Sequence, residues 1–200
     1  MTEAKGFALF DTPIGVCAIA WNPRGICGVS LPAGGEAPAR ARMRKRHPDA
    51  SESEPPPTVK KAIERIGALL RGEPDDLQSI KLDMDGIADF HRRVFDLART
   101  IPPGETMTYG SVAEKLNSPG AARAVGQALG ANPFPIIVPC HRVLGAGGKA
   151  GGFSAPGGTT TKMRMLTIEG ATVNRAPALF DQLPLVAPPR RPRTPPSRRR

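Results

Sequence analysis

The chain is organised around the sequence Ile136-Ile137-Val138-Pro139-Cys140-His141-Arg142-Val143. An apolar run followed by Pro-Cys-His-Arg predicts a buried strand that ends in a rigid corner, with Cys140 at that corner. The thiolate is the nucleophilic form of cysteine, and a neighbouring base such as His141, together with the N–H groups of a short helical turn, would activate it. A lone cysteine after an apolar run is also commonly a small buried hydrophobe, so these two residues alone leave both interpretations open.

The composition is typical of a globular protein inside the cell. The chain has 200 residues, of which 40% are hydrophobic, enough for one medium domain or two small ones. No segment approaches the roughly 20 apolar residues of a membrane span, and the N-terminus has no apolar signal core. The 3 cysteines are not clustered, which suits a reducing compartment. We therefore expect a cytoplasmic protein without membrane contact.

The net charge of +10 lies in the second half of the chain. Residues 1–85 carry 12 basic and 12 acidic side chains, residues 86–171 carry 9 and 5, and residues 172–200 carry 7 and 1. The last segment is also rich in proline, so it predicts a disordered basic tail. This asymmetry suggests nucleic acid as the partner of the second half, although basic tails also occur for other reasons.

Residues 1–85 predict a small domain with a three-stranded sheet. Apolar runs bounded by turn residues indicate strands, and apolar residues at helical spacing indicate helices. Strands are expected at 15–20, 26–31 and 77–84, and helices at 39–46 and 58–70.

Two cysteines and a basic run lie in this first part. Cys17 and Cys27 have no histidine nearby, so both are interpreted as structural and no metal is expected. The basic run at 40–46 is either a nucleic-acid patch or a solvated face, and the solvated face is the favoured interpretation.

Two short helices with a tight turn predict a helix-turn-helix in the second part. The first helix is expected at 109–116, with Thr108 as its cap. For the second, Ser118 is a good N-cap, Pro119 fits the first helical position and Gly130 suits the C-terminal stop.

The second of these helices carries almost only small side chains. Small residues let a helix backbone closely approach either a neighbouring helix or a DNA groove. Arg123 is its single cation, and within a helix-turn-helix it favours the DNA groove. The small residues are Gly120, Ala121, Ala122, Ala124, Gly126 and Ala128.

Two more helices are expected at 88–99 and 160–169, with a glycine-rich loop at 145–158 before the last one. The loop lacks the strand-then-helix context of a dinucleotide site, which we reject. Glu169 ends the last helix. A negative charge at the C-terminal end interacts unfavourably with the helix dipole, which costs roughly 0.3–1 kcal/mol of stability. Either Glu169 is exposed and tolerated there, or it orients His141.

The flanks of the central motif carry a family resemblance. Ala131-Asn132-Pro133-Phe134-Pro135 lies upstream and Gly151-Gly152-Phe153-Ser154 lies downstream. Together with Pro-Cys-His-Arg, this sequence resembles the active-site signature of the O6-alkylguanine-DNA alkyltransferases. The resemblance runs from about residue 90 to residue 171 and weakens back to residue 7.

The resemblance implies catalytic roles for five residues. Cys140 accepts the alkyl group, and His141 takes its proton through water with Glu169 behind it. Such a relay generalises the arrangement of nucleophile, base and orienting group. Tyr109 supports guanine N3, and Asn132 holds the turn near the cysteine by hydrogen bonds.

In that family the second helix of the helix-turn-helix enters the minor groove, and the damaged base is flipped out of the stack. Arg123 then fills the gap that the base leaves. Ala121, Ala122 and Tyr109 contribute to the same DNA contact.

The resemblance also implies a pocket for the flipped base. This chain departs from the family at Phe153, where tyrosine is usual. It also reads Ser-Ala-Pro-Gly-Gly from Ser154 onward, where Ser-Gly-Gly is common. The pocket residues are Pro135, Val143, Gly151, Phe153 and Ser154.

The expected fold is of the mixed α/β (α+β) class. Residues 1–85 form a ribonuclease H-like domain with a three-stranded antiparallel sheet, and residues 86–171 form a mostly helical, winged-helix-like domain with an active-site loop. The expected partner is double-stranded DNA that contains O6-alkylguanine, with O4-methylthymine as a possible second substrate. The protein is expected to be a monomer without a cofactor, and each molecule reacts once.

Three other functions fit the sequence less well. A damage sensor without chemistry would replace the nucleophile, but Cys140 is present. A transcription regulator of the adaptive response carries an extra cysteine-rich zinc domain, for which this chain has too few cysteines. A general thiol hydrolase does not account for the helix-turn-helix and the basic second part.

Overall fold

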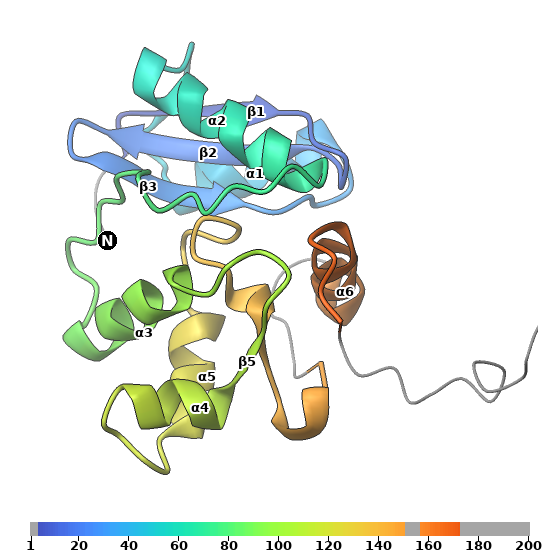
Figure 1. Cartoon of the computed structure of the whole chain (residues 1–200). Helices are drawn as coiled ribbons and strands as arrows, with labels where there is room; N and C mark the ends of the chain where they lie inside the picture. Colours follow the sequence, from blue (N-terminus) through green and yellow to red (C-terminus); the bar gives the residue numbers. More distant parts are fainter. Residues whose placement is uncertain (1–3, 151–156, 173–200) are drawn as a thin grey trace, which may run out of the picture.

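The computed structural model describes residues 4–150 and 157–172 and arranges them in two parts (Figure 1). The N-terminal part is a four-stranded sheet in the order β3-β2-β1-β4. The first three strands pair antiparallel, and β4 joins β1 in parallel. The predicted α/β class is confirmed, as are the strands expected at 15–20 and 26–31, which pair antiparallel as β2 and β3. The strands are β1 (Gly6–Phe10), β2 (Cys17–Asn22), β3 (Gly25–Ser30) and β4 (Ser51–Glu52).

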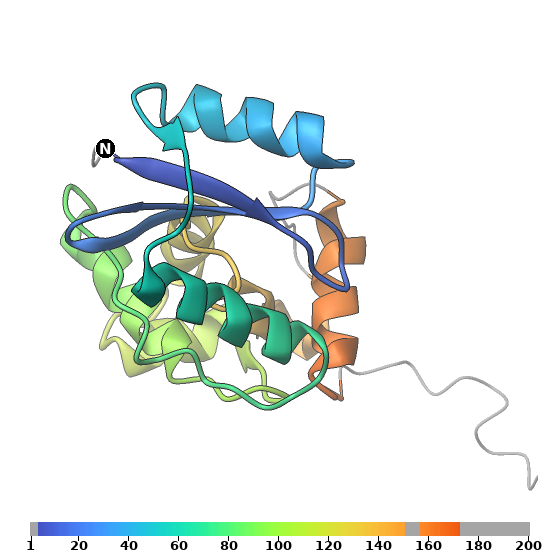
Figure 2. The same cartoon turned by 90° about the horizontal axis from the view of Figure 1, so that it is seen from above.

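Two helices cover opposite faces of this sheet (Figure 2). Successive side chains of a strand point to opposite faces, so neighbouring residues of β2 enter different clusters. Ala18 packs with Met43 of the first helix, whereas Ile19 belongs to the larger cluster with Ile66 of the second helix. The helices are α1 (Glu36–Arg46) and α2 (Pro57–Leu70).

The predicted strand at 77–84 is wrong. The third antiparallel strand is β1, and residues 77–84 meet the edge of β3 only at a bridge between Ile26 and Leu82. Leu77 has a positive φ of 55°, and such a left-handed residue interrupts the pleat of a strand. Leu77 and Ile80 are apolar because they pack into the larger core cluster, and not because they lie in a sheet.

The C-terminal part consists of short helices around a two-stranded parallel sheet (Figure 1). Because β5 pairs with β6 in parallel, the residue before β5 lies beside the end of the 3-10 turn η1, and the start of α4 lies beside the residues that follow β6. Its elements are α3 (Asp89–Arg99), β5 (Met107–Thr108), α4 (Tyr109–Lys115), α5 (Ala122–Gly130), η1 (Cys140–Arg142), β6 (Val143–Leu144), η2 (Ala146–Gly148) and α6 (Gly158–Ile168).

α4 and α5 form the predicted pair of short helices. The predicted cap of α4 is confirmed, because Thr108 Oγ1 accepts a hydrogen bond from the N–H of Ser111 at 3.0 Å. The predicted start of α5 at Ser118 is wrong, and the helix begins at Ala122. Gly120 has a φ of +85°, which is left-handed and cannot continue a right-handed helix.

Cys17 and Cys27 are buried in the sheet. Burial raises the pKa of the Cys17 thiol to about 12 and that of Cys27 to about 11, so both stay neutral thiols, as structural cysteines do. Within residues 4–150 and 157–172, no three His, Cys, Asp or Glu side chains gather to hold a metal ion. In the same ranges no helix has the length and apolar character needed to cross a bilayer.

Candidate active site

The apolar residues before Cys140 form a turn, and the buried strand predicted there is wrong. Ile136 is 1% exposed and has a positive φ of 76°, a conformation that is rare for a β-branched residue. The N–H of Val138 returns to the carbonyl of Phe134 at 2.8 Å. The chain therefore reverses before the cysteine, so the predicted corner is present without the strand.

Asn132 holds this turn from both sides. Its side-chain Nδ2 donates to the carbonyl of Val138 at 3.0 Å, and its Oδ1 accepts from the N–H of Phe134 at 2.9 Å. Asn132 also hydrogen-bonds with the Cys140 side chain, an interaction that lowers the pKa of the thiol. The hydrogen bonds predicted for Asn132 are thus present, and they couple the end of α5 to the cysteine.

Cys140 begins the 3-10 turn η1 and is 7% exposed. Burial raises the pKa of its thiol above the ordinary value. Hydrogen bonds from Asn132 and from the N–H groups of Cys140 and His141, together with the charge of Lys162, lower the pKa but do not outweigh burial. At rest the side chain is therefore a neutral thiol, and the groups that favour the thiolate already surround it.

His141 is fully buried and contacts Glu169. Its Nε2 lies 2.9 Å from Glu169 Oε1, while its Nδ1 has no hydrogen-bond partner among the described residues. Burial lowers the pKa of the imidazole, more than Glu169 raises it. The ring is therefore neutral, with one nitrogen bound to the carboxylate and the other available.

Glu169 is buried, with 3% of its side chain exposed. This excludes the interpretation that Glu169 is an exposed, tolerated carboxylate at the end of α6. Burial alone would raise the pKa of Glu169, but hydrogen bonds with His141 and Arg142 lower it to about 2. The group is thus an ionised carboxylate that contacts the imidazole.

Arg142 is a site residue for which the sequence suggested no role. Its Nε and Nη2 donate to the two carboxylate oxygens of Glu169 at 2.9 and 2.8 Å, and its Nη1 donates to the carbonyl of Ile101 at 2.6 Å. The side chain is 1% exposed. This bidentate ion pair compensates the buried negative charge of Glu169, which lies at the C-terminal end of α6, where the helix dipole disfavours a carboxylate.

Lys162 is a second site residue that sequence reasoning missed. It lies on α6 and is fully buried, whereas a lone lysine in a helix normally indicates an exposed position. Its Nζ donates to the carbonyl of Val143 at 2.7 Å and lies 5.8 Å from the ring centroid of Tyr109. Burial lowers the pKa of Lys162, and Cys140 acts in the opposite direction, so one amine lies close to both Cys140 and Tyr109.

Tyr109 also borders a shallow depression along α5. Its lining includes Arg123, Gly126 and Gln127, and a Cβ placed on Gly126 would lie 3.9 Å from the tyrosine ring. Arg123 and Gln127 are exposed on this face. The small residues of α5 thus leave an open surface beside Tyr109, and the helix packs inward through Val125, Ala128 and Leu129.

The predicted base pocket is only partly within the described residues. Pro135 is buried and bridges to Val138, and Val143 is buried in β6. Gly151, Phe153 and Ser154 lie outside the described residues. Of the predicted site residues, the structure places five around the turn η1: Cys140, His141, Glu169, Asn132 and Tyr109. Three others lie on the neighbouring helix α5 or at its start: Arg123, Ala122 and Ala121.

The chain is similar in sequence to known 6-O-methylguanine DNA methyltransferases. Residues 89–171 match the family model described as 6-O-methylguanine DNA methyltransferase, DNA binding domain. A methylated-DNA–protein-cysteine methyltransferase of Mycolicibacterium paratuberculosis is 38% identical over 171 residues, which cover 86% of this chain and 96% of the relative. One of Mycobacterium bovis is 38% identical over 178 residues, covering 88% and 98%.

A solved structure gives the same result for the fold. The Mycobacterium tuberculosis OGT in complex with DNA superposes with a TM-score of 0.67 at 34% sequence identity. The match covers 82% of this chain and 92% of that one. Sequence and fold thus agree over nearly the full length of these relatives, and the chain belongs to the methylated-DNA–protein-cysteine methyltransferase family.

Proposed function

We propose that the protein repairs DNA by moving the alkyl group of O6-alkylguanine onto Cys140. Membership of the family makes it a methylated-DNA–protein-cysteine methyltransferase that binds DNA. The observation that carries the assignment of the nucleophile is the group around Cys140. His141 binds the ionised Glu169 through one nitrogen at 2.9 Å and has no partner, among the described residues, on the other.

The chemical step starts from a neutral thiol and a neutral imidazole. With the damaged base in place, the thiol of Cys140 gives its proton, through water, to His141, and Glu169 stabilises the resulting imidazolium. The sulfur then attacks the alkyl carbon. A C–S bond forms as the C–O6 bond breaks, and the bonding electrons move to guanine. A hydrogen bond from Tyr109 to guanine N3 stabilises the charge that develops there.

Lys162 and Arg142 support this step without contacting the alkyl group. The Lys162 cation favours the thiolate and polarises Tyr109. Arg142 holds the Glu169 carboxylate by two hydrogen bonds, so that one oxygen remains directed at His141. The thioether has no route back to a thiol, so each molecule reacts once.

DNA is held through the open face of α5. The O6 substituent is not accessible for in-line attack inside the duplex, so the nucleotide must be flipped out. Arg123 is exposed beside Tyr109 and fills the vacated stack, while Ala121 and Ala122 allow close approach to the groove. In this proposal residues 86–171 act as the DNA-binding domain, residues 1–85 as a second domain, and the protein is a monomer on duplex DNA.

The assignment is tested by incubating the protein with a duplex that contains O6-methylguanine. Mass spectrometry is expected to find one methyl group on the peptide that contains Cys140. Cys140→Ala should bind the duplex but transfer nothing, whereas Cys17→Ser should transfer normally because Cys17 is a buried neutral thiol. Demethylation of the duplex by Cys140→Ala would refute the mechanism, and would favour a different nucleophile in the same protein.

A further inference from the structure

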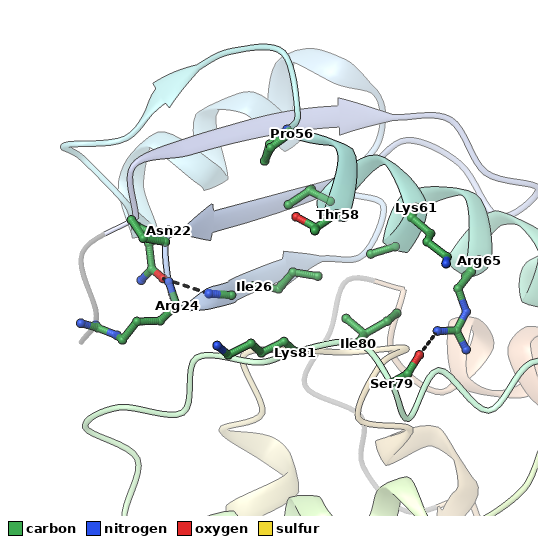
Figure 3. Close-up of a pocket in the computed structure, with 14 residues that line it drawn as sticks. Asn22, Arg24, Ile26, Pro56, Thr58, Lys61, Arg65, Ser79, Ile80 and Lys81 are labelled. Carbon is green, nitrogen blue, oxygen red and sulfur yellow. Dashed lines mark hydrogen bonds between the residues drawn. The ribbon is translucent and has the colours of Figure 1, made fainter.

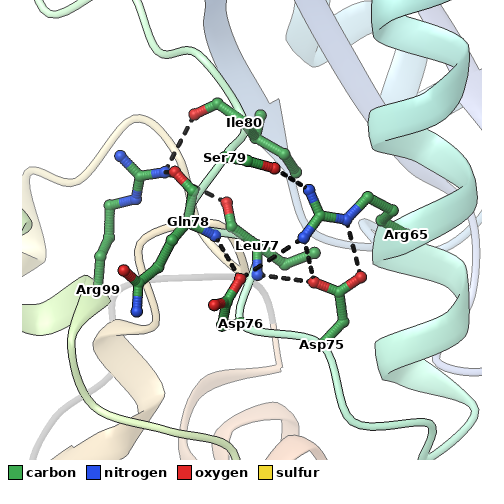
Figure 4. Close-up of polar contacts among 8 residues, drawn as sticks. All are labelled: Arg65, Asp75, Asp76, Leu77, Gln78, Ser79, Ile80 and Arg99. Carbon is green, nitrogen blue, oxygen red and sulfur yellow. Dashed lines mark hydrogen bonds and ion pairs between the residues drawn. The ribbon is translucent and has the colours of Figure 1, made fainter.

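Residues 75–80, which we call the connecting loop, lie in the chain that joins the two parts and are held from both. Arg65 of α2 binds the loop from one side, and Arg99 of α3 binds it from the other (Figure 4). The alkyl-transfer chemistry proposed above gives neither arginine a role. The two differ in what lies behind them, because Arg99 is two residues away from Ile101, whose carbonyl contacts the buried Arg142.

Arg65 ties the connecting loop to the N-terminal part. Its Nε donates to Asp75 Oδ2 at 2.8 Å, and its Nη1 donates to the Ser79 hydroxyl. Beyond Ser79 the chain passes along the edge of β3, where the N–H of Ile26 donates to the carbonyl of Lys81 at 3.0 Å (Figure 3). These contacts hold the loop against α2 and β3, and they reach no residue of the active site.

Arg99 ties the same loop to the end of α3. Its Nη2 donates to three backbone carbonyls that converge on it, those of Leu77 at 3.2 Å, Gln78 at 2.5 Å and Ile80 at 3.0 Å. Leu77 lies in the left-handed region, with a φ of 55°, a conformation that costs free energy unless neighbouring contacts hold it. The loop is therefore shaped around the guanidinium of Arg99, which anchors the last turn of α3.

The last turn of α3 carries Ile101 with it. The N–H of Thr100 donates to the carbonyl of Leu97 at 3.1 Å. The N–H of Ile101 donates to the carbonyl of Ala98, also at 3.1 Å, so helical hydrogen bonding continues past the end of the helix. Ile101 is 3% exposed. The position of its carbonyl therefore follows the position of the turn that Arg99 anchors.

The Ile101 carbonyl is one of the three acceptors that fix Arg142. Arg142 Nη1 donates to this carbonyl at 2.6 Å, while its Nε and Nη2 donate to the two carboxylate oxygens of Glu169. A guanidinium is a planar, rigid fork of donors, so a shift of the Ile101 carbonyl would turn the donors that face Glu169. The carboxylate that lies 2.9 Å from His141 would then lose its alignment.

We propose that Arg99 is a positioning residue for alkyl transfer, which sets the Ile101 carbonyl and thereby Arg142. Arg142 in turn aligns the Glu169 carboxylate with His141. This role rests on the proposed function, because it concerns the groups that activate the nucleophile. Coupling between distant residues is carried by continuous contacts, and each step from the connecting loop to His141 is a hydrogen bond or a turn of helix.

Arg99→Met and Arg65→Met are the matched pair of variants that tests this role. Each removes one guanidinium from the connecting loop and keeps an unbranched apolar side chain, but only Arg99 lies on the path to Ile101. The first measurement is the hydrogen exchange of the Arg142 Nε–H, followed by NMR near neutral pH. Exchange should become on the order of tenfold faster in Arg99→Met, which is the size of one lost hydrogen bond to a charged group. In Arg65→Met it should stay close to that of the unchanged protein.

The second measurement is the single-turnover rate of methyl transfer from a duplex that contains O6-methylguanine, at saturating DNA. Arg99→Met should transfer on the order of tenfold more slowly, and Arg65→Met at nearly the rate of the unchanged protein. Urea unfolding of both variants measures the stability that each has lost, so a general loosening of the fold is recognised by its presence in both. Arg99→Lys keeps a charge and one donor group and should recover part of both effects. If Arg99→Met does not fold, the comparison of Arg99→Lys with Arg65→Lys decides in its place.

Unchanged exchange of the Arg142 Nε–H in Arg99→Met would overturn the proposal, because Arg142 would then be held without Arg99. Equal acceleration in both variants would also overturn it, since the connecting loop would then act only on overall stability. Faster exchange without slower transfer would refute the role of Arg99 in the reaction. The exchange measurement needs no alkyl transfer, so it decides whether Arg99 sets Arg142 even if the unchanged protein fails to move the methyl group to Cys140.

Discussion

Glu169 joins three buried groups into one unit. A single buried carboxylate is costly unless it is paired and hydrogen-bonded, and here Arg142 supplies two donors and His141 contributes a ring nitrogen. The carboxylate therefore stays ionised, with a pKa of about 2. Because both partners follow Cys140 directly in sequence, this one residue fixes the orientation of the turn that carries the nucleophile.

The low pKa of Glu169 predicts a pH dependence of stability. A carboxyl group whose pKa falls from 4.5 in the unfolded chain to about 2 in the folded protein stabilises the fold above about pH 4.5. That contribution, on the order of 3 kcal/mol at about 1.4 kcal/mol for each pKa unit, is lost as the pH falls toward 2. Glu169→Gln should lack this pH-dependent part of the free energy of unfolding, which is measured by urea unfolding at several pH values.

The matched control for this experiment is Glu64→Gln, which changes an exposed carboxylate of α2. It should follow the pH curve of the unchanged protein. If Glu169→Gln loses stability in parallel with the unchanged protein between pH 4.5 and pH 2, then the carboxylate is not held by the ion pair described here.

The two faces of α5 differ: one packs into the core and the other is open to solvent. The inner face, with Val125, Ala128 and Leu129, is fully packed, and the outer face exposes Arg123 beside small residues. The C-terminal end leads directly into the turn that Asn132 holds beside Cys140. If α5 enters the DNA groove as proposed, it is therefore linked to Cys140 through one hydrogen-bonded turn.

Arg123→Ala is expected to separate base flipping from chemistry. If Arg123 replaces the flipped base in the stack, its loss should slow transfer from duplex DNA on the order of tenfold, the size of one stacking contact. Transfer from free O6-benzylguanine should change little, since no base must be flipped. Single-turnover rates on both substrates provide the measurement.

Lys115→Ala, which also removes one exposed positive charge, at the end of α4, serves as the control and should leave both rates nearly unchanged. Equal losses on the two substrates in Arg123→Ala would mean that Arg123 is needed for the fold of α5 and not for flipping.

Across the whole molecule the hydrophobic core is shared by both parts, whereas the excess positive charge lies only in the second. A single core cluster joins residues of both parts, among them Ile66 of α2 and Phe95 of α3, and Arg99 connects α3 to the chain between them. The excess positive charge, by contrast, lies in residues 86–200. The N-terminal part thus contributes to the common core, and the C-terminal residues supply the attraction for a polyanion.

Removing residues 187–200 is expected to weaken binding to all DNA sequences alike. This segment has six arginines, five prolines and no acidic residue, and arginine–phosphate interactions carry no base information. The truncation should reduce the slope of log affinity against log salt by about 0.9 for each phosphate that the segment neutralises. The rate of methyl transfer at saturating DNA should stay the same, because Cys140, His141 and Glu169 are untouched.

Filter binding or anisotropy at several salt concentrations measures this slope. A full-length variant with the same six arginines changed to glutamine separates charge from length and should behave like the truncated chain. An unchanged slope in the truncated protein would show that these residues do not contact DNA.

Local patterns in the sequence predicted most helices and the reactive motif. Apolar residues at helical spacing placed α2 and α3 within about two residues of their observed bounds, because a helix is defined by contacts three and four positions apart. Thr108 was recognisable as a cap for the same reason. Gly170 placed the end of α6 within the same margin. The roles proposed for Cys140, His141 and Glu169 came from the motif and its resemblance, and the structure brings Glu169 into contact with His141.

Long-range contacts decided the rest. Ile136 adopts its left-handed turn because buried neighbours and Asn132 hold it, while its β-branched sequence favours a strand. Arg142 and Lys162 look like surface residues in the sequence, but each is buried because its partner arrives from a distant segment. Arg142 meets Ile101 and Glu169, and Lys162 meets Val143. The cost of burying their charges is offset only when those segments have folded together, and no local pattern contains that information.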